Sequence, residues 1–358
     1  YAIGGLAIGL ACYRRGYPLT FSAALEPLLG ADHVNGVVGR VVDLLALYGT
    51  VFGVATSIGL AVGSMNATLG PLSGLPFNLY TQIGIVLLVS ALGVLSVLSG
   101  VANGIRRLSE MNVWLSMGLM CVIVLVGPTM WLAQMLPANA VDYFVNVIPM
   151  GFWLAESEAD HAWQTAWTVF YWGWWLAWTP FVAMFIARIS KGRTIREFIF
   201  GVLFVPVLVV VLWMTVFGGT ALHEELALTG SISDPVAVDY SMGLVATIER
   251  VASPDFYYPL LAVVAFLLFT WLITSLDSAT LVICHILHFE HIGGMKVLWG
   301  FILGGVTCTL MLVGGLQALQ AASIIIGLPM AVLMLLMTAS AFKMVTSDAD
   351  SKMSSPNS

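Results

Sequence analysis

The chain has 358 residues, of which 59% are hydrophobic and only 9% are charged, and its formal net charge is −6. A mean hydropathy of +0.97 lies far above the range of soluble domains, so the composition excludes a soluble globular protein and indicates an all-α integral membrane protein. We expect membrane lipid to surround it and no nucleic acid to bind it.

The four cysteines lie in apolar runs without CxxC spacing, so neither a disulfide framework nor a zinc site is expected. The chain begins at Tyr1 and shows no signal peptide. The apolar run before Arg14 is too short for a span of about 20 residues. We therefore expect the chain to be N-terminally truncated, so that it starts in the second half of a helix.

Eight full spans are predicted after the half-helix 1–13. They cover residues 41–65, 78–101, 112–135, 165–187, 198–221, 258–285, 296–316 and 319–342. If Arg14 and Arg15 are cytoplasmic, alternation of these spans places every other Lys and Arg on the same side except Arg250. The positive-inside rule thus supports the count, and it predicts a multi-pass protein of the plasma (inner) membrane with a cytoplasmic C-terminus.

The connections between spans differ in character. Residues 21–39 are predicted to form an interfacial connection, and residues 136–162 an extracellular amphipathic helix that lies along the membrane surface. Residues 344–358 form a short tail. The acidic residues of the outer loops are most simply explained as solvated charges.

One helix concentrates the aromatic residues of the chain. At about 100° per residue, Trp163, Phe170, Trp174, Trp178 and Phe181 fall on one face, with Trp175 at the edge of that face. Bulky aromatics can simply fill space between helices. However, clustered indoles pack poorly between membrane helices, which approach closely through Gly, Ala and Ser, whereas a cage of ring faces suits a quaternary ammonium.

The segment WTVFYWGWWLAWTPFVAMFIARISKGRTIREF resembles the signature helix and following loop of the betaine/choline/carnitine transporter family. The resemblance continues through GTVFGVATSIGL, FGGTAL and ITSLDSA and so covers nearly the whole chain. It implies a LeuT-type transporter core of two inverted repeats. Residues 1–135 would hold the remainder of the first repeat, residues 136–162 the connection, and residues 163–343 the second repeat. A homotrimer is also implied.

The resemblance implies functional residues at the matching positions. The cationic head of the substrate would be held by Tyr1, Phe170, Trp174, Trp175 and Trp178. One sodium site would use the hydroxyls of Thr274 and Ser275 and the carbonyl of Trp271. A second sodium site would use Thr50 and Phe181, but Val54 stands where the family has a further threonine, which argues against that second site.

Asp277 is a carboxylate inside a predicted span, and such groups are functional hypotheses by default. It lies far enough along its span that a structural role near the cytoplasmic surface is the alternative.

The sequence therefore predicts a transporter, not an enzyme. It would import a trimethylammonium solute, with glycine betaine favoured, together with sodium as coupling ion and without a further cofactor. A choline or carnitine carrier, driven by protons or by exchange of precursor for product, is the alternative; an intramembrane enzyme or a channel is more remote.

Overall fold

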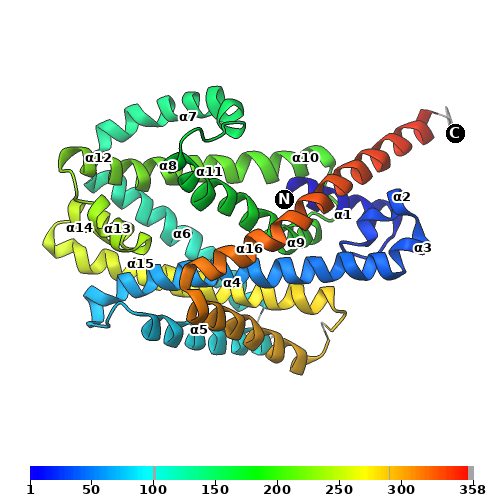
Figure 1. Cartoon of the computed structure of the whole chain (residues 1–358), viewed down its shortest axis with the longest axis horizontal. Coiled ribbons are helices and arrows are strands. Elements are labelled where there is room, and N and C mark those ends of the chain that lie inside the picture. The colour runs from blue at the N-terminus through cyan, green and yellow to red at the C-terminus, as the bar shows by residue number, and fades with distance from the viewer. Residues whose placement is uncertain (100–101, 290, 354–358) are drawn as a thin grey trace.

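The computed structural model describes residues 1–99, 102–289 and 291–353, and every regular element within these residues is a helix. A lipid-embedded chain has no water to satisfy its backbone N–H and C=O groups, and helices satisfy these groups within each segment. The predicted all-α membrane protein is thereby confirmed (Figure 1).

The helices take their bounds as follows. The long elements are α1 (Ala2–Arg15), α4 (Val37–Ser73), α5 (Leu79–Ser99), α6 (Ala102–Val126), α7 (Thr129–Gly151), α9 (Phe170–Ile189), α15 (Pro254–Ile286) and α16 (Gly293–Met353). The short α-helices are α2 (Glu26–Leu29), α3 (Ala31–Val34), α8 (Glu158–Gln164), α10 (Ile195–Ile199), α11 (Val205–Trp213), α12 (Gly219–Ala227), α13 (Ser233–Val238) and α14 (Gly243–Val251). The 3₁₀ turns are η1 (Ala23–Leu25) and η5 (Tyr240–Met242), and the π turns are η2 (Thr165–Val169), η3 (Phe200–Phe204) and η4 (Met214–Gly218).

Among the described residues, seven helical stretches are long and apolar enough to cross a membrane. The last of them, Gly293–Ser347, contains two glycines with non-helical angles, Gly314 and Gly315. Gly315 has φ 58°, in the left-handed region that glycine adopts without steric cost. The straight parts on either side of this kink correspond to the predicted spans 296–316 and 319–342, which accounts for the eighth span. The predicted end of span 78–101 lies outside the described residues.

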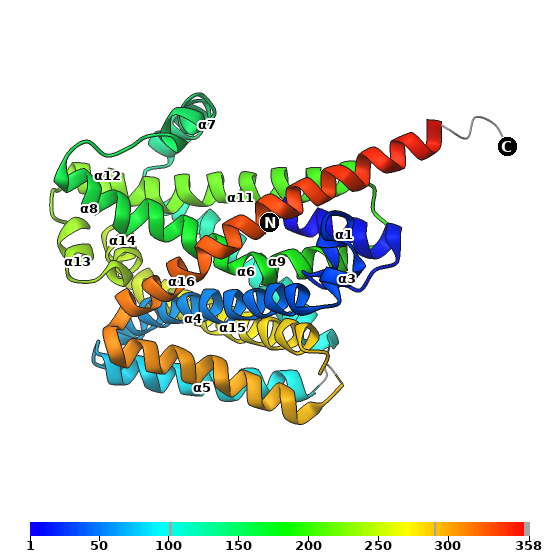
Figure 2. The same ribbon diagram turned by 45° about the vertical axis from the view of Figure 1, so that its right-hand side comes forward.

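The prediction of a span over 112–135 is wrong at its C-terminal end. The helix stops at Val126, and α7 starts at Thr129 after Gly127 and Pro128. Proline lacks the N–H that would continue the ladder and disfavours helical angles in the residue before it. The exposed helix expected from residue 136 onward therefore begins seven residues earlier, and α7 stands away from the bundle in Figure 2.

The centre of the bundle is the contact of α9 with α4 and with the C-terminal half of α16. A Cβ on Gly327 would lie 2.7 Å from the Cα and carbonyl oxygen of Gly173, and a Cβ on Gly53 would lie 3.1 Å from the Cα of Trp178. Membrane helices approach this closely only where side chains are small. These contacts fix the rotation of α9 about its axis and thereby the direction of its aromatic face.

We predict that Gly327→Ala destabilises the bundle because its methyl group would overlap the backbone of Gly173. Overpacking of this kind costs about 1–3 kcal/mol, so the thermal unfolding midpoint of the detergent-purified protein is expected to fall. Gly305→Ala in the same helix is the matched control, since a Cβ there meets no atom within 4 Å. Equal midpoints for the two variants would contradict the close contact.

Candidate substrate cavity

The aromatic helix starts from a capped turn and changes register before it reaches the core. The Ser157 hydroxyl accepts a hydrogen bond from the backbone of Asp160 at the start of α8. The π turn η2 follows, and its wider turn changes the angular positions of the residues before it relative to those after it. Trp163, before that turn, is 55% exposed and packs on Trp153 instead of facing the core. The continuous aromatic face predicted from residue 163 is therefore wrong in its first turns.

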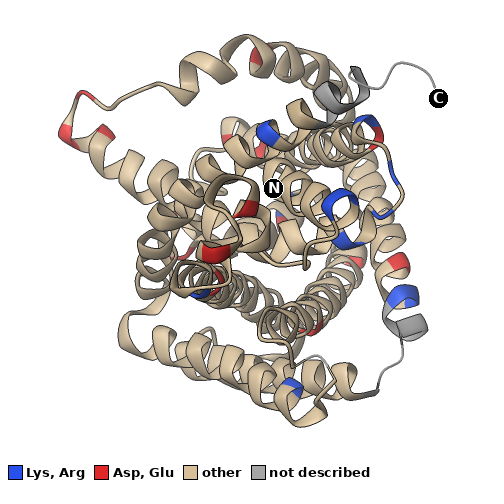
Figure 3. Cartoon of the chain, turned by 90° about the vertical axis from the view of Figure 1, so that its right-hand side faces the viewer, with Lys and Arg blue, Asp and Glu red and all other residues tan. Residues whose placement is uncertain are grey.

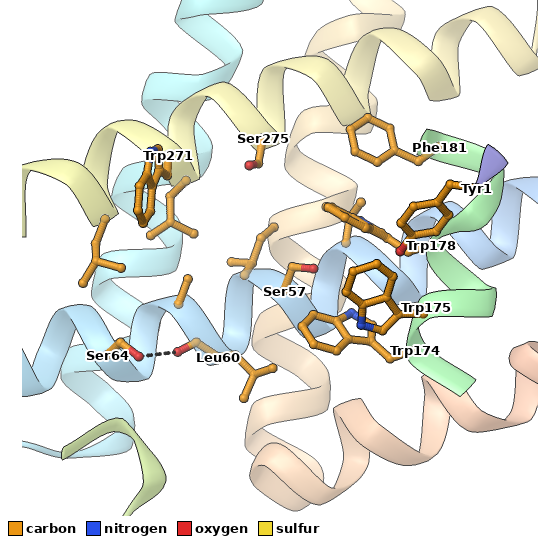
Figure 4. Close-up of a pocket in the computed structure, with 15 residues that line it drawn as sticks. Tyr1, Ser57, Leu60, Ser64, Trp174, Trp175, Trp178, Phe181, Trp271 and Ser275 are labelled. Atoms are coloured by element: carbon orange, nitrogen blue, oxygen red, sulfur yellow. Dashed lines mark hydrogen bonds between the residues drawn. The ribbon is translucent and has the colours of Figure 1, made fainter. Parts of the chain in front are cut away.

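Beyond the π turn, side chains of α9 open onto a cavity of about 390 Å³ between α1, α4, α9 and α15 (Figure 4). Its lining consists of Tyr1, Val54, Ser57, Ile58, Leu60, Ala61, Ser64, Trp174, Trp175, Trp178, Phe181, Leu268, Trp271, Leu272 and Ser275. None of these residues is charged. The cavity thus joins aromatic faces with a few hydroxyl groups.

The aromatic residues expected at a cation site converge at one end of this cavity. The ring of Tyr1 stacks on Trp175 with centroids 5.1 Å apart, and it meets Trp178 edge-on at 6.1 Å. Phe170 does not line the cavity: it is buried behind Trp174, whose ring it stacks on at 5.6 Å. The structure therefore places four of the five predicted residues on the cavity wall and the fifth as support.

Hydrogen bonds fix part of this wall, while other donors on it are buried. The indole N–H of Trp174 donates to the carbonyl of Gly53 at 3.0 Å, and the Ser57 hydroxyl donates to the same carbonyl at 3.0 Å. By contrast, the indole nitrogen of Trp178 and the hydroxyl of Tyr1 are buried without a hydrogen-bond partner among the described residues. Such groups cost about 1–3 kcal/mol each. Because neither atom is exposed to the cavity, the rings would have to shift before a ligand oxygen could reach them.

The predicted sodium residues separate into two groups. Trp271 and Ser275 line the cavity, while Thr274 lies beside them and donates to the carbonyls of Thr270 at 3.0 Å and Trp271 at 3.1 Å. The structure thus places Trp271 and Ser275 on the cavity wall, whereas the Thr274 hydroxyl, like that of Thr50, is bonded to its own helix and does not line the cavity.

At the second expected sodium site, Phe181 and Val54 line the cavity but Thr50 does not. Thr50 is fully buried, and its hydroxyl donates to the carbonyl of Ala46 at 2.9 Å. The structure does not bring Thr50 together with the cavity wall.

Sequence reasoning missed Ser57 and Ser64 of α4, which face the cavity opposite Ser275. Together with Ala61 they recur at intervals of three and four residues, the spacing of one helix face. Two serines and an alanine at this spacing were the sequence signal for a helix face lined by small side chains.

Together, the helical bundle and its uncharged, aromatic-walled cavity define a multi-pass membrane protein with a cavity between its helices. The chain belongs to the family described as "BCCT, betaine/carnitine/choline family transporter", whose profile matches residues 1–350. This confirms the resemblance seen in the motifs, and a LeuT-type core is consistent with that membership. The family is one of transporters, not enzymes.

Individual relatives support the assignment over nearly the whole chain. An osmo-dependent choline transporter of Acinetobacter baylyi is 36% identical over 96% of this chain and 50% of its own length. A high-affinity choline transport protein of Escherichia coli is 33% identical over 96% of this chain and 51% of its own length. A glycine betaine transporter of Bacillus subtilis is 36% identical over 97% and 67%, respectively. The chain thus spans about half the length of the first two relatives.

We predict that Trp175→Leu weakens binding of tetramethylammonium about fivefold, because Trp175 is half-exposed and a cation–π contact at an exposed site contributes up to about 1 kcal/mol. Equilibrium dialysis with the radiolabelled ion measures this without relying on tryptophan fluorescence. Trp163→Leu is the matched control, since Trp163 lies outside the cavity. A neutral tert-butyl compound of the same shape should not compete; competition would show that shape alone governs binding.

Proposed function

We propose that this protein is a secondary transporter that imports a quaternary-ammonium solute, with glycine betaine as the substrate and sodium as the coupling ion. The observation that carries the proposal is the convergence of Tyr1, Trp174, Trp175 and Trp178 on an uncharged cavity between membrane helices. The names of the relatives, which include choline and glycine betaine transporters, support the same substrate class.

The chemistry of the cavity suits a trimethylammonium head. Such a head has no N–H to donate, so hydroxyls and carbonyls gain little from it, whereas ring faces attract its charge. Ser275, which lines the cavity away from these rings, would face an oxygen at the other end of the substrate. A zwitterion with a carboxylate provides both parts.

Sodium coupling is supported by Ser275 on the cavity wall and by Thr274 next to it, whose hydroxyl would turn from the Trp271 carbonyl so that these neutral oxygens hold one ion beside the substrate. One sodium ion contributes about 2.3 kcal/mol per 100 mV and about 1.4 kcal/mol per tenfold gradient. The sum of roughly 4 kcal/mol would sustain accumulation of a neutral solute on the order of 10³-fold.

The remaining parts of the proposal follow from charge sorting and resemblance. We propose that the protein resides in the plasma (inner) membrane with its C-terminus in the cytoplasm, according to the positive-inside rule. We also propose that residues 1–135 and 163–343 form two inverted repeats and that the protein assembles as a homotrimer, as the family resemblance implies.

Choline is the second candidate, and the uncharged cavity lining favours it. No Lys or Arg lines the cavity to receive a carboxylate, and choline needs only an acceptor or donor for its hydroxyl. As a cation, choline is also driven inward by the membrane potential itself. Sodium dependence therefore separates the two substrates.

We expect proteoliposomes to take up glycine betaine in response to a sodium gradient, with a Hill coefficient for sodium nearer one than two. Thr274→Ala should abolish the response to sodium, because it removes one of about five ligand oxygens. Val54→Thr should raise the Hill coefficient by restoring a hydroxyl at the second site.

Two outcomes would contradict this account. Equal betaine uptake with and without sodium would rule out coupling, and a coefficient near two in the unaltered protein would show that Val54 does not weaken the second site. Uptake of choline but not betaine, driven by potential alone, would favour the second candidate. If the protein exchanges carnitine for a related product in the absence of sodium, that result would favour the precursor/product exchanger.

A further inference from the structure

A second hollow lies away from the aromatic cavity, where α1 meets the loop between α9 and α10. Its volume is about 400 Å³, and its two ends differ in chemistry. One end is apolar and is formed by Leu6, Leu10 and Phe198 together with the backbone at Gly9. The other end carries the cationic side chains of Arg14, Lys191 and Arg193, with Tyr13 and Thr194 beside them.

The basic end lies where the membrane-spanning α9 stops. α9 ends at Ile189, and the hydroxyl of Tyr13 at the end of α1 approaches the carbonyl of Arg188 at 3.4 Å. Figure 3 looks onto this end of the molecule and shows Lys and Arg segments gathered near the N-terminus. Cations at the end of a membrane helix face the headgroup layer, while apolar lining one or two turns further along faces the acyl chains.

No acidic residue lines the hollow. The nearest acid in sequence is Glu197, and its carboxylate is turned to its own helix start, where the backbone N–H and hydroxyl of Thr194 bond to it at 2.8 and 3.1 Å. This capping box bonds the carboxylate to Thr194, beside the cations. One acid thus stands against Lys191, Arg193 and Arg14, so the basic end keeps a net positive charge that complements an anion.

A neighbouring apolar hollow runs along α10 and η3, and it shares Ile195 with the hollow at α1. Its volume is about 480 Å³, and Ile199, Phe200 and Phe204 line it, with Arg196 at one end. Two apolar grooves thus diverge from one basic loop. A phospholipid has the same plan, with one phosphate and two acyl chains.

We propose that this region is a binding site for an anionic phospholipid. Lys191 and Arg193 would hold the phosphate headgroup, one acyl chain would lie along α1 over Gly9, and the other along α10 and η3. Arg is suited to the phosphate because its guanidinium donates two parallel hydrogen bonds. Basic pockets between membrane helices recognise lipid headgroups in this way. The site is separate from the aromatic cavity, so the proposal does not depend on the transported substrate.

The headgroup half of the site is tested with Lys191→Gln/Arg193→Gln in the full chain, purified in neutral detergent. Native mass spectrometry with phosphatidylglycerol and phosphatidylcholine measures lipid affinity and preference. One surface cation contributes about a factor of five in affinity for an anionic lipid, so the double variant should lose about 25-fold for phosphatidylglycerol and none for phosphatidylcholine. Arg106→Gln/Arg107→Gln removes the same charge elsewhere and should change either affinity less than twofold.

The acyl half is tested with Gly9→Leu, which preserves every cation. A Cβ at Gly9 meets no atom within 4 Å, so a side chain added there starts in open space and occupies the groove; an unchanged thermal unfolding midpoint checks that the variant is folded. We expect weaker binding of phosphatidylglycerol but unchanged binding of its soluble headgroup, glycerophosphoglycerol.

Three results would overturn the proposal. Unchanged phosphatidylglycerol affinity in Lys191→Gln/Arg193→Gln would remove the headgroup site. An equal loss in the Arg106→Gln/Arg107→Gln control would show that net charge alone is sensed. Unchanged lipid binding in Gly9→Leu, with the soluble headgroup bound as tightly as the lipid, would indicate a site for soluble anions.

Discussion

The close approach of α9 to α4 and α16 is the contact on which the rest of the structure depends. Between membrane helices apolar surface gains little from contact, since lipid is equally apolar, so packing must come from surfaces that fit closely. Glycines provide this fit on two sides of α9. Gly49 and Gly53 of α4 lie against its backbone on one side, and Gly327 of α16 lies against Gly173 of α9 on the other. Once two faces of α9 are occupied by backbone contacts, Trp174, Trp175 and Trp178 are left on the side that borders the cavity, while Trp172 points outward and is exposed.

The same contact also orients the cage rings. The carbonyl of Gly53 accepts the indole N–H of Trp174, so the residue that allows the helices to approach also fixes the ring. Phe170 holds the other face of that ring by stacking. In contrast, Trp178 and Tyr1, which also line the cavity, each keep a buried polar atom without a partner among the described residues. A satisfied donor therefore fixes one ring of the wall, while the other two rings are not held by hydrogen bonds from the part of the chain that the structure describes.

Much of the fold could be predicted because span length and charge sorting depend only on local composition. The motif segments likewise placed Trp174, Trp175 and Trp178 together, and the structure brings them to one cavity. Other features depend on single backbone events. The break at Pro128 and the π turn before Phe170 shift the helix ends and faces without changing hydropathy. The direction of a side chain such as Thr50 depends on neighbouring helices, which composition does not encode.

Because the cavity wall carries no charged side chain, the empty cavity has no buried charge to stabilise. A carboxylate in this cavity would attract sodium and protons as strongly as an organic cation, and it would carry a desolvation cost of several kcal/mol whenever the site was empty. A desolvated ring face attracts an organic cation by about 2 kcal/mol per contact. Because the rings carry no net charge, they add no desolvation cost when the site is empty. Among the described residues, the buried carboxylate of Asp277 instead accepts a hydrogen bond from Ser96 on α5 at 3.3 Å. Because it does not line the cavity, the proposed function leaves selection between organic and inorganic cations to the aromatic rings, which would favour the larger, weakly hydrated ion.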